Sequence, residues 1–378
     1  MDKVAIIGVG QTTSEMVKKE MFYDVTAEAS RLAVEDAGLE RRDVDNVVLG
    51  EYDLAIGRTA SHMYTIPAVG GFYRDEIRVN DDGLFAVVQA YLGIASGEYD
   101  VTLVASTGIS SEAPQEKVTN LQLDPFFHRP MGLFDRMANA MQAERYRQRY
   151  GITPEQSARV VVKNRRNAAA NPHACLRDEV TVDDVLSSPY TAYPLRQLEC
   201  AARADGACAV IMASEPTARR ICPRPVWIAG LGWFNDTYYL GDKELSELGA
   251  LRLAAGSAYK MAGIKNPAKE IDVAEVFDVT AYHELMACEA LGFCGPGEGG
   301  RIMEEGITEP AGMLPVNPSG GLTSSYILAA SGLAGLLEAA LQLTGRAQSR
   351  QVPDCRTALA QSMTGWGNQR ACVAILRR

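Results

Sequence analysis

The stretch Val4-Ala-Ile-Ile-Gly-Val-Gly10 recurs near the middle of the chain as Val226-Trp-Ile-Ala-Gly-Leu-Gly232. Each copy is an apolar run that predicts a buried β-strand, and each ends in Gly-x-Gly. A dinucleotide-binding Gly-x-Gly-x-x-Gly motif needs a third glycine, but Thr13 stands at its position. Because both copies share the pattern, we interpret the glycines as a structural turn and exclude a dinucleotide site.

The residues that follow each copy extend the repeat over two halves of the chain. Each predicted strand leads to a helix of small residues that ends at a glycine, with Ala33, Ala37 and Gly38 in one half and Ala258, Ala262 and Gly263 in the other. Small residues four apart share one helix face, and a glycine after them is a typical helix end. The alternation continues with predicted helices at 84–97 and 328–345 and with strands that begin at 101, 207 and 371. We therefore predict two homologous α/β halves.

The composition fits a folded protein with more than one core. The chain has 378 residues, of which 47% are hydrophobic and 22% charged, and its formal net charge is -10. A single hydrophobic core rarely extends over this length. An acidic chain disfavours nucleic acid or an anionic membrane as the main partner. No apolar stretch is long enough to cross a bilayer, and the N-terminal run fits a strand better than a signal peptide.

The eight cysteines contain no C-x-x-C pair. In a chain of this length without a signal sequence they indicate free thiols, rather than a disulfide framework or a zinc site. The sequence therefore predicts a cytoplasmic protein without a metal site.

The alternation of strands and helices breaks between residue 114 and about residue 200. This segment contains a helix rich in Arg and Lys that begins at Pro154, and prolines mark its return. We predict a loop domain inserted into the first half. The expected organisation is an N-terminal half over 1–113, the loop domain over 114–200, a return strand over 201–220 and a C-terminal half over 221–378.

Several motifs resemble those of the thiolase superfamily, in particular its sterol-carrier-protein-x (lipid-transfer-protein) branch. The most specific are Asn317-Pro-Ser-Gly-Gly-Leu322 and the run 284–298, which contains Glu289-Ala-Leu-Gly-Phe-Cys-Gly295. Ala204-Asp-Gly-Ala207 resembles the return strand of that branch. The resemblance implies two βαβαβαββ halves in a five-layered α/β/α/β/α fold, a homodimer, and acyl-CoA substrates with no cofactor besides the CoA that the substrate carries.

All four thiolase active-site motifs are altered in this chain. The nucleophilic cysteine of V-N-x-x-C falls on Gly83, and the histidine of H-D-x-F is replaced by Phe277. The histidine of G-H-P is absent from the segment that ends at Tyr326, and the C-x-G cysteine is absent from Thr364-Gly-Trp-Gly367. Glycine cannot attack a thioester, so the sequence argues against ordinary thiolysis.

Retro-aldol cleavage of a 3-hydroxyacyl-CoA needs no nucleophile. It needs a base for the β-hydroxyl proton and donors for the enolate oxygen. Steroid side-chain aldolases of this superfamily carry tyrosines in the patterns Y-D-x-F-T and S-E-x-Y. Tyr326 resembles the second pattern, whereas Phe277 departs from the first. We predict Tyr326, Asp278, Tyr282 and His283 as catalytic candidates and the backbone near Gly83, Gly365 and Gly367 as oxyanion donors. Candidate substrate-binding residues are Phe277, Asn317, Ser319, Gly320, Gly321 and Trp366.

Most of these residues also have a purely structural interpretation. Tyr326 could be a packing tyrosine, and Asp278 could cap the helix that follows it. Glu284 is expected to be solvated or ion-paired, and Cys294 to be a buried structural thiol. Asp81 and Asp82 either cap the helix that begins at Gly83 or form an acid–base pair, and we favour capping.

The predicted loop domain supplies further candidates. Lys163, Arg165 and Arg166 could bind the CoA phosphates, although a solvated helix face is the favoured interpretation. Phe126, Phe127 and Met131 could line an acyl pocket or pack within the loop domain.

Three functions remain open at this level. The leading hypothesis is an acyl-CoA carbon–carbon lyase that cleaves a bulky or branched 3-hydroxyacyl-CoA in lipid or steroid degradation. The second is a non-catalytic subunit of a hetero-oligomeric acyl-CoA complex, and the third is a thiolase (acyltransferase) that uses another thiol. The resemblance also implies a small partner protein with a zinc ribbon and an OB fold.

Overall fold

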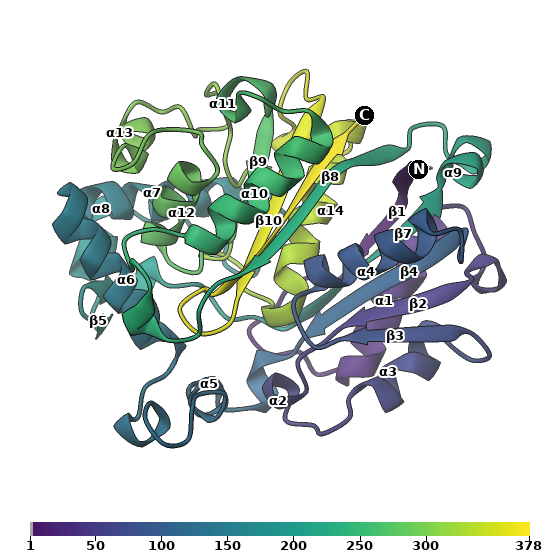
Figure 1. The fold of residues 1–378 in the computed structure, drawn as a ribbon, viewed down its shortest axis with the longest axis horizontal. Coiled ribbons are helices and arrows are strands. Elements are labelled where there is room, and N and C mark those ends of the chain that lie inside the picture. Colours follow the sequence, from purple (N-terminus) through teal and green to yellow (C-terminus); the bar gives the residue numbers. More distant parts are fainter. Residues whose placement is uncertain (1–2) are drawn as a thin grey trace.

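The computed structural model describes residues 3–378, whose main element is a nine-stranded mixed sheet (Figure 1). Its strands follow the order β3-β2-β4-β7-β1-β8-β11-β10-β9. The first half contributes β1 (Val4–Gln11), β2 (Asn46–Gly50), β3 (Asp75–Val79), β4 (Val101–Gly108) and β7 (Gly206–Ser214). The second half contributes β8 (Val226–Asn235), β9 (Val273–Glu275), β10 (Thr357–Thr364) and β11 (Arg370–Arg377).

The strand order confirms the internal repeat. The first strands of the two halves, β1 and β8, pair at the centre of the sheet through Ala5 with Trp227 and Ile6 with Val226. On either side of this contact the strands follow in equivalent order, β7-β4-β2-β3 in one direction and β11-β10-β9 in the other. The two halves are therefore related by an approximate two-fold arrangement.

The second half departs from the expected βαβαβαββ pattern at its third strand. In the first half, β3 lies beyond β2 at the edge of the sheet. At the equivalent place in the second half, beyond β9, only Val316 pairs, through a single parallel bridge to Ala274. Pro315 and Pro318 flank this position, and Asn317 adopts a φ of 53°. Prolines cannot donate a ladder hydrogen bond and a positive φ breaks the extended chain, so the strand is reduced to one bridge.

Helices cover and separate the two halves of the sheet in five layers, as the resemblance implied. Helices α1 (Phe22–Asp36) and α3 (His62–Val69) lie outside the first half, and α10 (Gly249–Ala262) and α12 (Ala281–Ala290) lie outside the second. Between them lie α4 (Gly83–Ala95) and α14 (Ser331–Thr344), close to the predicted ranges.

The alternation of side chains along the strands shows the layers directly. In β4, Val104 packs in the cluster that contains Leu84 of α4 and Leu333 of α14. Its neighbours Leu103 and Ala105 pack with α1 on the opposite face. Both faces of the strand are therefore buried, as a nearly continuous apolar run requires.

The repeated Gly-x-Gly lies inside the strands β1 and β8, so the interpretation as a structural turn is wrong. A Cβ atom added to Gly8 would lie 2.4 Å from the Ala33 carbonyl oxygen, and one added to Gly230 would lie 2.3 Å from the Ala258 carbonyl oxygen. The glycines therefore allow α1 and α10 to approach the sheet closely, and the small residues of those helices complete the same contact. The absence of a dinucleotide motif is consistent with this role.

Residues 114–200 fold into α5 (Gln115–Leu121), α6 (Asp135–Tyr150), α7 (Pro154–Ala169), α8 (Val182–Ser187) and a short hairpin of β5 (Tyr190–Ala192) and β6 (Leu195–Arg196). Although this segment interrupts the first half in sequence, α6 and α7 share one hydrophobic cluster with α10 and α12 of the second half. The remaining helices are short: α2 (Asp53–Ile56), α9 (Glu215–Ile221), α11 (Pro267–Glu270) and α13 (Gly299–Glu304). None of the helices among residues 3–378 combines the length and the apolar character needed to cross a membrane.

Candidate active site

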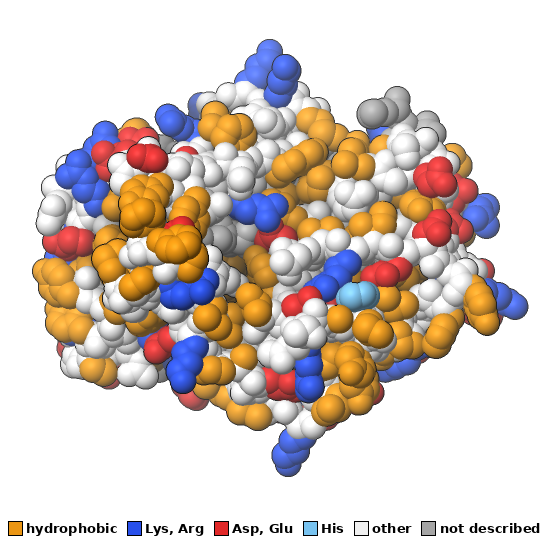
Figure 2. Space-filling model, turned by 60° about the horizontal axis from the view of Figure 1, so that its bottom comes forward, with side chains coloured by type: hydrophobic (Ala, Val, Ile, Leu, Met, Phe, Trp, Pro, Cys, Tyr) orange, Lys and Arg blue, Asp and Glu red, His pale blue; other side chains and the backbone are white. Residues whose placement is uncertain are grey.

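A cavity of about 310 Å³ lies where the loop between β10 and β11 meets α2, α5 and α6. This side of the molecule comes forward in Figure 2, where hydrophobic side chains flank a hollow in the surface. A volume of this size is within the range of small-molecule sites. Its walls combine apolar side chains with hydroxyl, amide and carboxylate groups, the polar members being Tyr52, Gln115, Thr119, Gln122, Asp135, Asn139, Tyr238, Tyr326, Thr364, Asn368 and Gln369.

Tyr326 lies on the wall of this cavity, as predicted for a catalytic tyrosine. Its backbone is held to the return segment, because its N–H donates to the Ala202 carbonyl at 2.7 Å and its carbonyl accepts from the Ala204 N–H at 2.9 Å. Its ring meets Phe277 edge to face with the ring centroids 5.8 Å apart. Burial, with a smaller contribution from Asp135, raises the pKa of Tyr326 well above its usual value. The phenol therefore keeps its proton and is a hydrogen-bond donor.

A second tyrosine, Tyr52, lies on the same wall. It precedes α2 and packs in one small apolar cluster with Tyr326 and Leu328. Its hydroxyl donates to Asp81 Oδ1 at 2.8 Å, and Asp81 also forms an ion pair with Arg370. Burial, followed by the charge of Asp81, raises the pKa of Tyr52 well above its usual value.

The loop between β10 and β11 forms another side of the cavity. Gly365, Gly367 and Asn368 all adopt positive φ angles, and Lys243 donates to the Gly367 carbonyl at 2.7 Å. Gly365, Trp366 and Gly367 line the cavity, as predicted for oxyanion and substrate-binding positions. The loop residues therefore border the space that a ligand would fill.

His283 lies just behind this loop and does not line the cavity. Its ring nitrogens contact Thr280 Oγ1 at 2.7 Å and the Asn368 side-chain amide at 2.9 Å. Burial and, to a smaller extent, Lys243 lower the pKa of His283 to about 3, so the imidazole is neutral. It supports Asn368, which does line the cavity.

Gly83, where thiolases would carry the nucleophile, is buried and does not line the cavity. A Cβ atom added there would lie 2.8 Å from the Cβ atoms of both Leu333 and Ser106. Asp82 caps α4 by accepting from the Leu84 N–H at 2.9 Å, as we favoured, and its other oxygen accepts from the Gly332 N–H of α14 at 2.8 Å. One carboxylate thus joins the first turns of both central helices.

A buried polar network lies behind the cavity and contains several predicted site residues. Glu284 forms an ion pair with Lys163 and accepts from the side-chain amides of Asn164 and Asn317, each at 2.8 Å. Asn164 also donates to Asp278 at 2.9 Å. This network fastens α7 to α12 and to the segment at Asn317.

The network corrects three expectations. Lys163 is only 1% exposed, so the solvated helix face predicted for it is wrong and it cannot reach a phosphate at the surface. Arg165 is also buried, whereas Arg166 is exposed and pairs with Glu309. Asp278 does not cap α12, because Thr280 is the residue before its first turn and no side chain caps this end. The Asp278 carboxylate accepts from the Leu322 N–H at 2.7 Å instead. The two errors on α7 arise because α7 packs against the second half of the chain, a contact distant in sequence.

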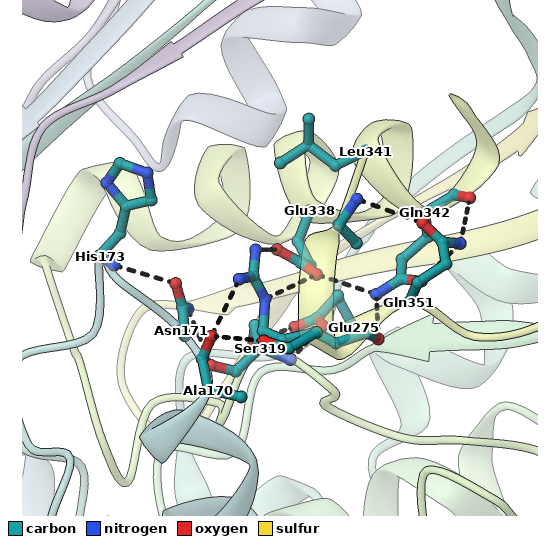
Figure 3. A network of polar contacts seen from close by, with 12 residues as sticks. Ala170, Asn171, His173, Glu275, Ser319, Glu338, Leu341, Gln342 and Gln351 are labelled. Carbon is teal, nitrogen blue, oxygen red and sulfur yellow. Dashed lines mark hydrogen bonds and ion pairs between the residues drawn. The ribbon is translucent and has the colours of Figure 1, made fainter. Parts of the chain in front are cut away.

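The glycines of Asn317-Pro-Ser-Gly-Gly-Leu322 provide space rather than reactive groups. A Cβ atom on Gly320 would lie 2.5 Å from Ala168 Cβ, and one on Gly321 would lie 2.6 Å from the Asp278 carboxylate. Ser319 donates through its N–H and its hydroxyl to Glu275. Figure 3 shows this contact beside Glu338 in a polar network that continues to the C-terminal part of α14. A second, smaller cavity of about 50 Å³ lies here, and Phe277 lines both cavities.

The remaining sequence-predicted residues lie away from the cavity. Tyr282 is buried toward Ser157 and Glu199, which face its hydroxyl. Phe126, Phe127 and Met131 are exposed and line neither cavity, so the predicted acyl-pocket role has no support in the geometry. Their packing alternative also fails, because their segment leaves these side chains in solvent.

No cysteine lines the main cavity, and all eight thiols are free. Burial raises the pKa of seven of them, namely Cys175, Cys200, Cys208, Cys288, Cys294, Cys355 and Cys372. A raised pKa favours the neutral thiol, the opposite of what a catalytic cysteine needs. Residues 3–378 also contain no cluster of His, Cys, Asp and Glu that could hold a metal ion.

Four polar residues on the wall of the cavity were not predicted from the sequence, namely Tyr52, Asp135, Asn139 and Asn368. Asn368 follows Gly367 directly in the altered C-x-G motif, and this position could have been noted. Tyr52, Asp135 and Asn139 carry no local signal, because they reach the cavity through the packing of α2 and α6 against the second half.

Two family descriptions together match almost the whole chain. "Thiolase, N-terminal domain" matches residues 4–216, and "Thiolase C-terminal domain-like" matches residues 234–378.

The similar proteins include both acyltransferases and a lyase by their names. An acetyl-CoA acetyltransferase of Methanothermobacter thermautotrophicus is 34% identical over 98% of this chain and 98% of the relative. The 17-hydroxy-3-oxo-4-pregnene-20-carboxyl-CoA lyase of Mycobacterium tuberculosis is 31% identical over 91% of this chain and 92% of the relative. Among solved structures, an Ltp2-ChsH2(DUF35) aldolase superposes with a TM-score of 0.84 at 27% identity over 99% of this chain and 97% of that chain.

Proposed function

The chain belongs to the thiolase superfamily of acyl-CoA enzymes, in its sterol-carrier-protein-x branch, and we propose that it is an acyl-CoA carbon–carbon lyase that cleaves a bulky or branched 3-hydroxyacyl-CoA by a retro-aldol reaction. The products would be a ketone or aldehyde and a shortened acyl-CoA. We place this reaction in the degradation of a lipid or steroid side chain.

One observation carries the proposal. The cavity has tyrosine hydroxyls on its wall, whereas the place of the thiolase nucleophile is filled by the packing of Gly83 against Leu333 and Ser106. Thiolysis requires a thiolate that accepts the acyl group. Retro-aldol cleavage requires only proton transfer at the β-hydroxyl and stabilisation of the enolate, and phenols can supply both.

In the mechanism that we propose, Tyr326 donates a hydrogen bond to the thioester oxygen as negative charge develops there. A donor must keep its proton, and burial raises the pKa of Tyr326 so that it does. The backbone around Gly365 and Gly367 lines the same cavity and offers further dipoles to the enolate oxygen. A fixed donor in a partly dry cavity stabilises such charge more strongly than water does.

The test is a direct assay with a defined substrate. Purified protein is incubated with 3-hydroxy-3-methylbutyryl-CoA and with a 3-hydroxyacyl-CoA whose β-carbon is a ring tertiary alcohol. We expect ketone and shortened acyl-CoA in equal amounts, without consumption of free CoA. Consumption of free CoA with a 3-ketoacyl-CoA, and no cleavage of either hydroxy ester, would contradict the proposal.

A second candidate is a non-catalytic or acyltransferase subunit of a hetero-oligomeric acyl-CoA complex. It is favoured by the name of the M. thermautotrophicus relative, an acetyl-CoA acetyltransferase with the higher identity of the two relatives. An acyltransferase would need one of the eight cysteines as nucleophile. Stoichiometric labelling of one cysteine by an acyl-CoA analogue would support it, and binding of acyl-CoA without turnover would support the non-catalytic role.

We also propose a small partner protein with a zinc ribbon and an OB fold. The support is the solved aldolase neighbour, whose title names a DUF35 component together with the thiolase-like chain. Co-expression with a DUF35-type protein should give a stable complex with higher lyase activity than the chain alone. Equal activity and separate elution would contradict this proposal.

We propose in addition that the chain forms a homodimer along the edge strand β3. This strand ends the sheet, and Phe72 and Tyr73 are exposed just before it. An unpaired strand edge beside exposed aromatic residues is a favourable surface for pairing. Light scattering should report twice the chain mass, and the double substitution Phe72→Asp and Tyr73→Asp should give the monomer.

A further inference from the structure

Tyr52 can accept a hydrogen bond from a ligand in the cavity but cannot readily donate one, because its hydrogen is already used. Its single hydroxyl hydrogen is given to Asp81 Oδ1 at 2.8 Å, while the side chain lines the main cavity. A phenol has one hydrogen and two oxygen lone pairs, so even with the Thr364 hydroxyl beside it one lone pair remains for a donor in the cavity. The β-hydroxyl of a bound 3-hydroxyacyl-CoA is such a donor.

Asp81 is held in place as the acceptor of the Tyr52 proton. It is 1% exposed and does not line the cavity, whereas its hydrogen-bond partner Tyr52 does. Arg370 forms an ion pair with it, and the Asp82 N–H donates to Oδ1 at 2.8 Å. The Arg370 guanidinium stacks over the Phe85 ring at 4.8 Å, which holds the ion pair in one place.

We propose that Tyr52 is the catalytic residue that takes the β-hydroxyl proton, and that Asp81 is the positioning residue that receives this proton through it. The proposal rests on the proposed lyase function and names the base that this function requires. Tyr52 thus supplies, from the first half of the chain, the tyrosine that the second half lacks at Phe277.

The step balances without any further reactant. The substrate O–H bond breaks and its hydrogen passes to the Tyr52 oxygen, while the Tyr52 hydrogen passes to Asp81. The oxygen electrons form the new C=O bond, and the electrons of the Cα–Cβ bond form the enolate of the thioester. After the ketone leaves, Tyr52 returns a proton to Cα and recovers one from Asp81, so one proton has moved from oxygen to carbon.

The transfer of a proton through Tyr52 to Asp81, which we call the relay, also explains how a tyrosine can act as a base here. Burial and the charge of Asp81 raise the pKa of Tyr52, so a free tyrosinate would be scarce. A phenol that passes its own proton to a carboxylate as it accepts another never needs to become a free tyrosinate. The effective base is then the carboxylate, and the phenol only carries the proton.

Asp135 is the competing base on the cavity wall. It accepts from Thr119 Oγ1 at 3.2 Å and lies 3.5 Å from Arg203. It is the first residue of α6 and, unlike Asp81, it lines the cavity directly. Asp135 therefore enters the experiment as a rival variant.

The experiment compares Tyr52→Phe, Asp81→Asn and the double variant in the cleavage assay with 3-hydroxy-3-methylbutyryl-CoA. We expect kcat to fall about 10²–10⁴-fold in each single variant, with KM changed less than about threefold. The double variant should be no more than about threefold slower than the worse single variant, because two members of one relay lose the same step. A merely structural tyrosine would change KM or stability and would give additive losses.

The control is Tyr259→Phe, which removes another buried hydroxyl, one that donates to the Leu291 carbonyl at 2.8 Å outside the cavity. It should leave kcat unchanged. If the Tyr52→Phe enzyme keeps more than a third of the wild-type kcat, the proton transfer through Tyr52 is wrong, although the lyase function stands. The same conclusion follows if cleavage is lost in Asp135→Asn and in neither of the other single variants. If Asp81→Asn does not fold, Tyr52→Phe still decides. Wild-type protein that cleaves no hydroxy ester overturns both proposals.

Discussion

The wall of the main cavity and the polar network behind it use similar residues in opposite ways. On the wall, Tyr52 and Tyr326 border an open space. In the network, Lys163, Glu284 and Asn317 are buried and bonded to one another. The residues that match the family motifs most closely lie in the network, whereas the altered motif positions other than the buried Gly83 lie on the wall. The difference shows that the matching motif residues hold the site together, whereas the residues that border the ligand space differ from those of a thiolase.

The network has the larger effect on stability, and Glu284→Ala tests this most severely. The substitution leaves the Lys163 ammonium buried without its partner, so we expect the free energy of unfolding to fall by about 3–5 kcal/mol. Urea denaturation measures the loss. The matched control is Glu305→Ala, whose partner Arg301 is exposed, and it should cost less than about 1 kcal/mol. Similar small losses in both variants would remove the distinction between network and wall.

The wall has the larger effect on catalysis, and Tyr326→Phe tests it. Removal of one donor to the enolate oxygen should lower kcat by about 10²–10³-fold, while the free energy of unfolding changes by less than about 1 kcal/mol. Tyr282→Phe is the control, because Tyr282 is near in sequence to the altered H-D-x-F motif but buried away from the cavity. Steady-state kinetics of both variants should separate them, and equal losses of kcat would place Tyr282 in the chemistry after all.

Gly83→Cys tests whether the position of the thiolase nucleophile now belongs to the core. A cysteine there would press on Leu333 and Ser106, so we expect a loss of about 1–3 kcal/mol in stability. We expect no thiolysis of a 3-ketoacyl-CoA, which an assay of free CoA would follow. In contrast, Gly256→Ala in α10 meets no atom within 4 Å and should stabilise the protein by about 0.5–1 kcal/mol. Thiolysis by the Gly83→Cys enzyme would show that the position still opens to substrate.

The smallest effect concerns Asp82, which joins the two central helices beside the wall. Burial raises its pKa to about 7, above the value of 3.8 expected in the unfolded chain. The folded state therefore holds this proton more tightly, and the stability that Asp82 contributes is present at low pH and is lost as the pH rises through 7. Between pH 6 and pH 8 the loss should be about 1 kcal/mol.

Urea midpoints of wild type and Asp82→Asn across this pH range measure that loss. Asp278 and Glu275 also have raised pKa values, so only the difference between the two proteins belongs to Asp82. The variant, which cannot ionise, should show a shallower fall in stability with pH. Equal slopes would contradict the assignment.

Much of the fold could be predicted from the sequence. The repeated Gly-x-Gly strands, the helices of small residues and the alternating order identified two homologous halves, because burial on both faces imposes apolar runs and close packing imposes small residues. The reduction of the third strand in the second half to Val316 was not predicted, although Pro315 and Pro318 mark it.

Less of the site could be predicted. Phe277, Tyr326, Gly365, Trp366 and Gly367 were expected at the site and line the cavity. Asp278, Tyr282, His283 and Gly83 were expected there and do not line it. Their placement depends on which side of a helix or turn faces the cavity, and the neighbours that decide this come from α6, α7 and the return segment.

The sequence by itself determined the superfamily, the repeat and the absence of a cysteine at the nucleophile position, because each of these depends on the residue type at one position. Only the tertiary structure decided which polar groups meet. Tyr52 and Asp81 lie 29 residues apart, and Lys163 and Glu284 lie 121 residues apart. The tyrosine of the first pair lines the cavity, whereas both residues of the second pair are buried away from it. Burial and hydrogen-bond geometry are properties of the packed chain, and they separate a residue that can take part in a reaction from one that holds the fold.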